Sequence, residues 1–354
     1  MNLLGVFLGH ERILSKKESG TLTGTVHSKT YNERSNEAIL LVSLRAAHTT
    51  DSTPLRTTGG TLKRITLFLI RVSRAAFYNT PIHRIPLVTN IYERLFHFAF
   101  SRDELVRVSC HGMQLEIPGK DITILPSLLN QTYEAYELEL LEQLLRPGTT
   151  FIDVGANIGI YTLIAARLIE PTGIAYSFEP APENFEILKR NLVNNHLTNV
   201  VTEQVAIGDR IGRSVLYLAD NSIGTHSLLR HSPMDRQDQE VGVPVTTLDA
   251  YFSSEMPTIV DLLKIDVEGY EPFVLEGATA LLRRTNKILI EYNRLVIEST
   301  YGIVPFIQLL ADFPYLYGIN ERSKSLSRFS RSDFFSETYL NLLVSKTEMR
   351  TFLV

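Results

Sequence analysis

The segment from Phe151 to Thr162, FIDVGANIGIYT, constrains the fold more than any other stretch of the chain. The β-branched and aromatic residues from Thr149 to Val154 are typical of a buried strand. Gly155 allows a sharp turn after that strand, and Gly159 allows a ligand or the next helix to approach closely. Asp153 stands at the carboxyl end of the strand, where open α/β sheets bind ligands. The pattern predicts a strand, a glycine-rich turn and a helix that border a binding crevice.

The residues after this turn alternate between helix and strand patterns. Strands are expected at 174–178, 200–207, 214–218, 241–245, 259–265, 287–291 and 339–344. After the turn helix, further helices are expected at 182–194, 271–284 and 305–312. This alternation predicts an α/β fold with a mostly parallel sheet and helices on both of its faces.

The chain before this unit divides into two segments. Residues 1–62 are rich in Ser, Thr, Gly and Asn, which predicts a flexible or low-complexity leader. Residues 63–118 combine basic amphipathic helices at 63–100 with a hairpin at 105–118, whose turn is expected at His111 and Gly112. The basic helices are expected either to contact an anionic membrane surface or to pack on the main domain, 119–354.

Composition narrows the class of protein and its compartment. The net charge of −4 gives no general reason to expect a nucleic-acid partner. Cys110 is the single cysteine, so an intrachain disulfide is impossible, and a reducing compartment is favoured. The sequence lacks an apolar run long enough to span a membrane, and its start is a poor signal peptide. These features predict a cytoplasmic protein with possible peripheral membrane contact through 63–100.

Two acidic residues at successive strand ends point to a nucleoside-containing ligand. A glycine turn admits close backbone approach, and Glu179 at the end of the second strand can accept hydrogen bonds from both ribose hydroxyls. Asp153 would repel a pyrophosphate but attract a cation. The charge pattern therefore favours S-adenosyl-L-methionine, with its sulfonium and ammonium groups, over a nicotinamide dinucleotide.

A second acidic group follows the strand at 259–265, in the sequence KIDVEGYE. Asp266 and Glu268 are expected to face the same crevice as Asp153, and Gly269 permits a tight turn. A carboxylate beside an acceptor hydroxyl could act as a general base. A structural ion pair between Lys264 and an acid is the alternative.

Five motifs in this order, FIDVGANIGIYT, FEPAPENFEILKRNLVNN, VAIGD, VTTLD and DLLKIDVEGYE, resemble the FkbM family of S-adenosylmethionine-dependent methyltransferases over roughly residues 130–295. The resemblance implies a class I, Rossmann-like fold with a seven-stranded sheet. It also implies O-methylation of a hydroxyl on a carbohydrate, glycolipid or secondary metabolite.

The resemblance also implies roles for individual residues. The methionine end of the cofactor would be lined by Asp153, Gly155, Asn157 and Gly159. Glu179 would bind the ribose, and Ala206 would flank the adenine. Asp266 and Glu268 would face the methyl group and the acceptor.

Two weaker signals complete the candidate site. His226 is a further candidate base, although a surface histidine is an equal alternative. Asp266, Glu268 and Glu291 together have the chemistry of a divalent-cation site, but no ligand spacing requires one, so no metal is predicted. The acceptor, the oligomeric state and the identity of the base are left open.

The sequence therefore predicts a methyltransferase. Two alternatives stay open at this point. One is a nucleotide-dependent oxidoreductase, which Asp153 disfavours because of its charge. The other is a non-catalytic cofactor-binding protein attached to a membrane surface through 63–100.

Overall fold

The computed structural model describes residues 96, 100–101, 104–219, 222–230 and 239–349, all within one compact unit, Thr57–Val354. The predicted leader and nearly all of the predicted basic helices lie outside the described residues, so both remain predictions, as does the division into three segments. Phe96 and Phe100 are fully buried, and their ring centroids lie 4.9 Å apart. These two rings belong to the same core as α5 and α6, so the end of the basic segment packs on the α/β unit.

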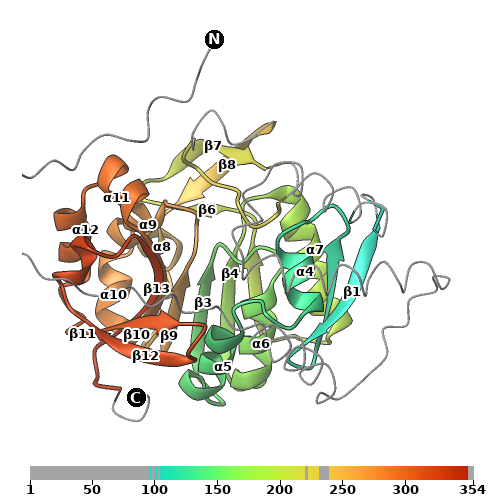
Figure 1. Cartoon of the computed structure of the whole chain (residues 1–354), viewed down its shortest axis with the longest axis horizontal. Coiled ribbons are helices and arrows are strands. Elements are labelled where there is room, and N and C mark those ends of the chain that lie inside the picture. Colours follow the sequence, from blue (N-terminus) through green and yellow to red (C-terminus); the bar gives the residue numbers. More distant parts are fainter. Residues whose placement is uncertain (1–95, 97–99, 102–103, 220–221, 231–238, 350–354) are drawn as a thin grey trace, which may run out of the picture. The chain divides into compact units, whose positions relative to one another are not determined.

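An eight-stranded sheet lies at the centre of the unit, in the order β12–β11–β13–β10–β9–β3–β4–β5 (Figure 1). Its five neighbouring parallel strands are β10 (Lys287–Asn293), β9 (Leu262–Ile265), β3 (Thr150–Val154), β4 (Ile174–Phe178) and β5 (Val200–Glu203). Parallel strands with helical crossovers are the architecture that the alternating pattern predicts. The predicted Rossmann-like α/β fold with a mostly parallel sheet is therefore confirmed.

The other edge of the sheet is antiparallel. β13 (Tyr339–Ser345) pairs antiparallel with both β10 and β11 (Tyr315–Asn320), and β12 (Ser325–Phe329) adds an antiparallel strand outside β11. The 3-10 turn η2 (Asp333–Phe335) precedes β13. The expected count of seven strands is wrong, because the short stretch at β12 buries Leu326 and Phe329 and forms an eighth, edge strand.

Side chains of the central strands alternate between two apolar cores, one on each face of the sheet. In β9, Leu262 packs into the first core, whereas Leu263 and Ile265 pack into the second. The first core contains α4 (Ile124–Leu129), α5 (Ala135–Leu144), α6 (Ile160–Ile169) and α7 (Pro182–Asn194). The second contains α8 (Leu248–Tyr251), α9 (Glu271–Glu276), α10 (Thr279–Arg284), α11 (Arg294–Thr300) and α12 (Ile303–Leu309). Helices therefore cover both faces, as predicted.

Two predicted elements are interrupted. The expected strand at 200–207 ends at Glu203, and its last part, β6 (Ala206–Ile207), joins β8 (Gln239–Thr246) and β7 (Gly212–Leu218) in a separate sheet. The expected helix at 271–284 divides into α9 and α10 around Gly277, where the chain approaches Gly208 so closely that a Cβ would lie 2.0 Å from the Gly208 carbonyl oxygen.

The predicted hairpin is confirmed as β1 (Leu105–Cys110) and β2 (Met113–Pro118). His111 and Gly112 have φ angles of 46° and 79°, the left-handed values that a two-residue hairpin turn requires. The side chain of Asn191 accepts a hydrogen bond from the backbone amide of Glu116 at 2.7 Å. The hairpin is thus attached to α7, beside which it lies in Figure 1.

Candidate functional site

The turn between β3 and α6 has a backbone that only a few residue types tolerate. Gly155 has a φ of 82°, and a Cβ at this position would lie 1.9 Å from the carbonyl oxygen of Asp266. Glycine is therefore required both for the left-handed conformation and for the close approach of the β9 end. Asn157 also has a positive φ, 53°, and its backbone amide donates to Glu179 Oε2 at 2.8 Å. The turn thus joins the carboxyl ends of β3, β4 and β9.

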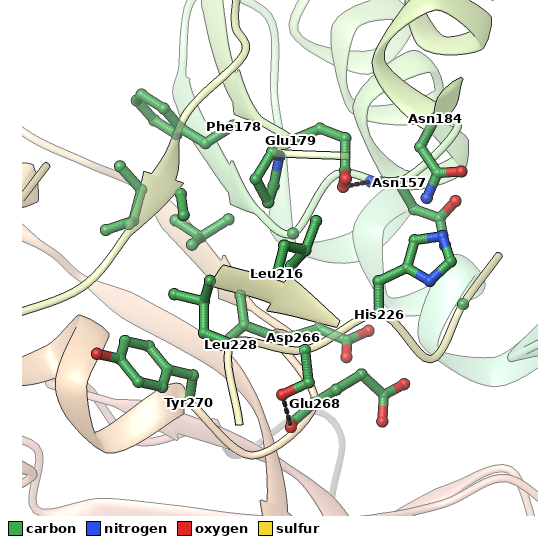
Figure 2. Close-up of a pocket in the computed structure, with 18 of the residues that line it drawn as sticks. Asn157, Phe178, Glu179, Asn184, Leu216, His226, Leu228, Asp266, Glu268 and Tyr270 are labelled. Carbon is green, nitrogen blue, oxygen red and sulfur yellow. Dashed lines mark hydrogen bonds between the residues drawn. The ribbon is translucent and has the colours of Figure 1, made fainter. Parts of the chain in front are cut away.

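A pocket of about 540 Å³ opens at these strand ends, and we call it the first pocket (Figure 2). Its apolar side is formed by Phe178, Val205, Ala206, Ile207, Leu216 and Leu228. Its polar side carries Asn157, Glu179, Asn184, His226, Asp266 and Glu268. This mixture of apolar and polar surfaces is typical of a small-molecule site. Of the predicted cofactor residues, the pocket brings together Gly155, Asn157, Glu179 and Ala206.

Glu179 is held in place by backbone amides. Its Oε2 accepts from the amide of Asn157, and its Oε1 accepts from the amide of Ala181, both at 2.8 Å. Burial raises the pKa of Glu179 to about 7. Each carboxyl oxygen keeps a further lone pair, so the group can also accept hydrogen bonds from a vicinal diol.

Two amide side chains present acceptors in the same pocket. Asn157 Nδ2 and Asn184 Nδ2 both donate to the carbonyl oxygen of Ile223, at 3.1 and 2.9 Å. Because that carbonyl is an acceptor, it orients both amides and leaves their Oδ1 atoms without a partner. Asn184 is only 2% exposed, so its unpaired oxygen is costly unless a ligand donates to it.

Asp153 and Gly159 line neither the first pocket nor the second pocket described below, so their contact with the cofactor remains a prediction that this geometry does not support. Asp153 follows Phe151 by two residues in β3, so both side chains lie on the same face of the sheet. Asp153 therefore points into the core beneath α6 and not beyond the end of the strand. The hydroxyl of Thr162 donates to Asp153 Oδ2 at 2.6 Å, and Lys264 Nζ lies 4.0 Å from Oδ1. Gly159 instead gives space to Leu188, which would lie 2.4 Å from a Cβ there.

Lys264 and Asp266 form an ion pair, which is the structural alternative that the sequence KIDVEGYE left open. Lys264 is 4% exposed, and its Nζ lies 3.0 Å from Asp266 Oδ2. Burial opposes its charge, but attraction to Asp266 and Asp153 more than compensates, so the pKa of Lys264 lies above its ordinary value. Lys264 therefore orients Asp266 at the edge of the pocket.

His226 lines the first pocket, but its surroundings disfavour the predicted role as a general base, which remains a prediction. Its Nδ1 accepts from the backbone amide of Ala219 at 3.1 Å. Burial, with a smaller contribution from Lys120, lowers the pKa of His226 to about 4. The ring is neutral at pH 7, and its free Nε2 carries the proton, so this atom donates hydrogen bonds.

A second pocket of about 790 Å³ adjoins the first and lies on the α5-facing side of the sheet. Three neighbouring strands contribute to this pocket: β9 through Lys264, β10 through Glu291 and β13 through Asn341. In each strand this residue points to the same face of the sheet as the residues of the first core. Tyr133, Glu134, Tyr161 and Tyr339 complete much of its wall. Five residues line both pockets: Gly155, Asn157, Gly224, Asp266 and Glu268. The two predicted acids therefore lie where the pockets meet.

The carboxyl groups around this junction have unusual proton affinities. Burial, together with Asp266 and Glu271, raises the pKa of Glu268 to about 8. Burial and the same neighbouring acids raise the pKa of Glu291 to about 10. The pKa of Glu134 rises to about 7, mainly through burial. A carboxyl whose pKa lies near neutral pH is well matched to general acid–base chemistry.

Within the part of the chain that the structure describes, no group of three or more His, Cys, Asp or Glu side chains is arranged so that it could hold a metal ion. Asp266, Glu268 and Glu291 do line the second pocket together. Their mutual repulsion shows in the raised pKa values of Glu268 and Glu291.

The first pocket fits the cofactor that the sequence predicts. Its apolar side suits an adenine, and Glu179 suits a ribose diol. The unpaired Oδ1 of buried Asn184 needs a donor such as a hydroxyl or an ammonium group. The residues present are thus complementary to S-adenosylmethionine at three separate points.

Several site residues escaped the sequence reasoning. Asn184 lies in the first turn of α7, Glu134 precedes α5, and Tyr161 lies in α6. Asp121 accepts hydrogen bonds from the amides of Ile124, Leu125 and Ile223, so it holds the loop whose carbonyl orients the two asparagines. The only sequence signal for these residues was the presence of polar side chains on the apolar face of a helix. Such a pattern does not identify a ligand-binding residue.

Comparison with known proteins gives independent evidence on the family. A family model described as the methyltransferase FkbM domain matches residues 153–338. Methyltransferase 1 of Beauveria bassiana is 34% identical over 149 residues, which is 37% of this chain and 59% of that protein. The 31-O-demethyl-FK506 methyltransferase FkbM of Streptomyces tacrolimicus is 31% identical, over 38% of this chain and 60% of that protein.

A third relative, the 2-O-methyltransferase NoeI of Sinorhizobium fredii, is 26% identical over 50% of this chain and 79% of its own length. The chain spans about three fifths of the length of the first two relatives. The family model covers more than half of the chain and contains the turn, Glu179 and both junction acids. The predicted resemblance is confirmed, and the chain belongs to the FkbM methyltransferase family.

Proposed function

We propose that this protein transfers a methyl group from S-adenosylmethionine to a hydroxyl oxygen of a small molecule, such as a carbohydrate, a glycolipid or a secondary metabolite. The observation that carries the proposal is the junction of two pockets at Asp266 and Glu268. The first pocket is complementary to the cofactor, and the second leaves room for an acceptor. When bound, the cofactor supplies an electrophilic methyl group on its sulfonium.

The chain's own residues would supply positioning, which can account for much of the rate in such a transfer. Glu179 would accept hydrogen bonds from the ribose hydroxyls, and Asn184 Oδ1 would accept one from a donor on the cofactor. Ala206 and its apolar neighbours would enclose the adenine. Asp153 would act indirectly, because it helps to hold Lys264, which in turn orients Asp266.

Glu268 is the proposed proton acceptor for the acceptor hydroxyl. It lines both pockets, and its pKa of about 8 is close to the value that favours a general base at neutral pH. Asp266 is the weaker candidate, because its carboxylate is paired with Lys264 at 3.0 Å. His226 would donate a hydrogen bond and would not accept the proton.

The names of two relatives support transfer to oxygen. One is a 31-O-demethyl-FK506 methyltransferase and the other a 2-O-methyltransferase. The polar wall of the second pocket supports an acceptor with several hydroxyl groups, since tyrosine, asparagine and carboxyl side chains can all hydrogen-bond to hydroxyls.

The proposed location is the cytoplasm, on the ground of the single cysteine, with peripheral membrane contact through 63–100 as an option. Among the described helices, none combines the length and the apolar character that crossing a membrane requires. Co-sedimentation of the full chain and a 63–95 deletion, which keeps the buried Phe96 and Phe100, with anionic vesicles would test the contact.

The experiment that tests the function combines binding with product analysis. Purified protein and isotope-labelled S-adenosylmethionine are incubated with a cell extract, and small molecules are searched by mass spectrometry for the added methyl group. Labelled product is expected with the wild type and with Glu186→Gln, an exposed substitution in α7. Product that forms equally with Glu268→Gln, or no binding of S-adenosylhomocysteine by the wild type, would contradict the proposal.

A further inference from the structure

The motif KIDVEGYE contains one carboxyl that the proposed transfer does not use. Glu271 is the first residue of α9, it is 0% exposed, and it lines neither pocket. It is more deeply buried than Asp266 and Glu268 in the same motif. Burying a carboxyl is costly unless its hydrogen bonds are satisfied, so its position calls for a physical reason.

The side chain of Glu271 folds back onto the turn that precedes α9. Its Oε1 accepts hydrogen bonds from the backbone amides of Val267 and Gly269, both at 3.0 Å. These two amides lie one on each side of Glu268, the proposed proton acceptor. Glu268 itself has a φ of 54°, in the left-handed region that a glutamate rarely adopts. One carboxyl oxygen therefore holds both sides of a strained turn in place.

Two further contacts hold the same turn from other elements. The Ser227 hydroxyl donates to the Glu268 carbonyl oxygen at 2.8 Å. The Asp266 amide donates to the Val154 carbonyl oxygen at 3.1 Å. Ser227 belongs to the chain after β7, and Val154 ends β3. The turn is thus fixed from three directions, and Glu271 supplies the contacts on the α9 side.

The second carboxyl oxygen of Glu271 is buried without a hydrogen-bond partner among the described residues. A negative charge on this group is therefore compensated by the two amides and by no donor at Oε2. Such a charge acts strongly on neighbouring groups, because the protein interior screens it less than water does. A buried polar atom without a partner is uncommon in folded proteins, which indicates a functional use for Glu271.

We infer that Glu271 is a positioning residue for the methyl transfer, because it fixes the turn that presents Glu268 at the junction of the two pockets. The inference rests on the proposed function and deepens it, since it names a further residue on which the same site depends. Glu271 would touch neither the cofactor nor the acceptor and would act through Glu268. Loss of this anchor should therefore reduce the rate of transfer more than it reduces cofactor binding.

The charge of Glu271 supports this role and gives it a second readout. Burial raises the pKa of Glu271 to about 7, so the group is mostly ionised at the pH of about 8 where Glu268 titrates. Removal of this like charge should therefore lower the pKa of Glu268. The titratable groups that face Glu268 from the surrounding elements are Glu271 and Asp266 of its own turn, Glu134 before α5, Lys264 of β9, Glu291 of β10 and Tyr339 of β13.

Two substitutions separate the anchor from the charge. Glu271→Gln removes the charge but keeps an oxygen that can accept from both backbone amides, whereas Glu271→Ala removes the charge and the anchor. Glu276→Gln is the matched control, because this carboxyl lies on the same helix and is exposed. Glu139→Gln on α5 is a second control, because this carboxyl pairs with Lys324.

Two measurements on the full chain test the turn itself and need no acceptor. In hydrogen exchange, the amides of Val267 and Gly269 are expected to exchange at least about tenfold faster in Glu271→Ala, and close to the wild-type rate in Glu271→Gln and in both controls. Carbon-13 NMR of the chain labelled at its glutamate carboxyls follows the titration of Glu268, whose signal is the one missing in Glu268→Gln. Its midpoint is expected to lie at least about half a pH unit lower in Glu271→Gln than in the wild type.

A third measurement tests the consequence for transfer. The rate of isotope transfer from labelled S-adenosylmethionine to small molecules of a cell extract is expected to fall at least about tenfold in Glu271→Ala. The affinity for S-adenosylhomocysteine is expected to stay within about threefold of the wild type, since Glu271 lines neither pocket. Glu271→Gln is expected to recover most of the lost rate, because its amide oxygen keeps the anchor.

Wild-type exchange of the two amides in Glu271→Ala, an unchanged Glu268 midpoint in Glu271→Gln, or a parallel loss of rate and cofactor affinity would overturn the inference. If Glu271→Ala does not fold, the Glu268 midpoint in Glu271→Gln decides it. A wild type that does not bind S-adenosylhomocysteine contradicts the proposed function itself. The exchange and NMR results then still decide whether Glu271 fixes the turn.

Discussion

The two pockets lie at the same edge of the same sheet but have opposite chemical characters. The first is half apolar, and its one deeply buried carboxyl, Glu179, is held by two backbone amides. The second is polar, and Lys264 is the cation set against its four carboxyl side chains in the described lining.

The difference in chemical character between the two pockets arises largely from the face of the sheet to which the lining side chains point. The first pocket extends beyond the ends of β3, β4 and β9, where turns and the small sheet supply its walls. The second lies over the α5-facing side of the sheet, where alternate residues of β9, β10 and β13 project. One sheet edge can therefore hold the cofactor and a polar acceptor side by side, which methyl transfer from one to the other requires.

The largest effect is expected where the two pockets share backbone. Gly155→Ala places a Cβ 1.9 Å from the Asp266 carbonyl and forces a left-handed alanine. We expect the free energy of unfolding to fall by about 2 kcal/mol or more, with loss of ligand binding in both pockets. Denaturant titration measures this. Gly242→Ala in β8 is the control, because its Cβ would meet only the Arg213 side chain, at 3.5 Å.

The next effect separates chemistry from binding at the junction. Glu268→Gln is expected to reduce kcat about 100-fold and to change S-adenosylhomocysteine affinity little, because the substitution keeps size and removes the base. The wild-type rate should rise with pH up to about 8, since the base acts in its ionised form. His226→Gln should keep that pH midpoint and lose less than about tenfold in kcat. A large kcat loss in His226→Gln with none in Glu268→Gln would reverse the assignment.

A smaller effect is confined to the first pocket. Asn184→Ala removes an amide oxygen that has no partner in the protein and a bond to the Ile223 carbonyl. We expect about tenfold weaker S-adenosylhomocysteine binding by calorimetry, the effect of one hydrogen bond. Asn194→Ala, an exposed change on the same helix, should match the wild type. Unchanged affinity in Asn184→Ala would remove this residue from the cofactor site.

A further effect concerns the dependence of stability on pH and arises mainly from the second pocket. Glu291 has a pKa of about 10 in the folded protein and an ordinary value of 4.5 when unfolded. A raised carboxyl pKa contributes stability that is fully present below the ordinary value and is lost as pH rises towards the folded value. The protein should therefore melt at least several degrees lower at pH 8.5 than at pH 5.5, because one such carboxyl changes the free energy of unfolding by about 1.4 kcal/mol per pH unit in this range.

Glu291→Gln removes this titration and should flatten the dependence of Tm on pH, whereas Glu139→Gln should not. Differential scanning calorimetry across the pH range measures both. A steeper fall in Glu291→Gln than in the wild type would contradict the assignment of this carboxyl.

Much of the fold followed from local sequence patterns. The parallel strands are short apolar runs, and the turn at Gly155 and the hairpin at His111 and Gly112 carry their own conformational signatures. β12 was missed because five residues with two buried side chains resemble a loop. The interruption at Gly277 depends on a contact with Gly208, which no local pattern contains.

The site was predictable only where a residue's role depends on its position along a strand. Glu179, Asp266 and Glu268 were placed correctly at strand ends, and all line the pockets. Asp153 was assigned to the crevice by the same rule, but its parity in β3 turns it towards Thr162 and Lys264. Glu134 and Asn184 come from helices that tertiary packing brings to the sheet edge, which the sequence pattern alone does not specify.

The central claim is that the first pocket binds the cofactor and the second does not. Titration calorimetry of S-adenosylhomocysteine against wild type, Glu179→Gln and Glu291→Gln tests it most directly, with the fold of each variant checked by its unfolding transition. We predict that Glu179→Gln weakens binding at least about tenfold and that Glu291→Gln leaves it unchanged. Wild-type affinity in Glu179→Gln, with lost binding in Glu291→Gln, would contradict the account.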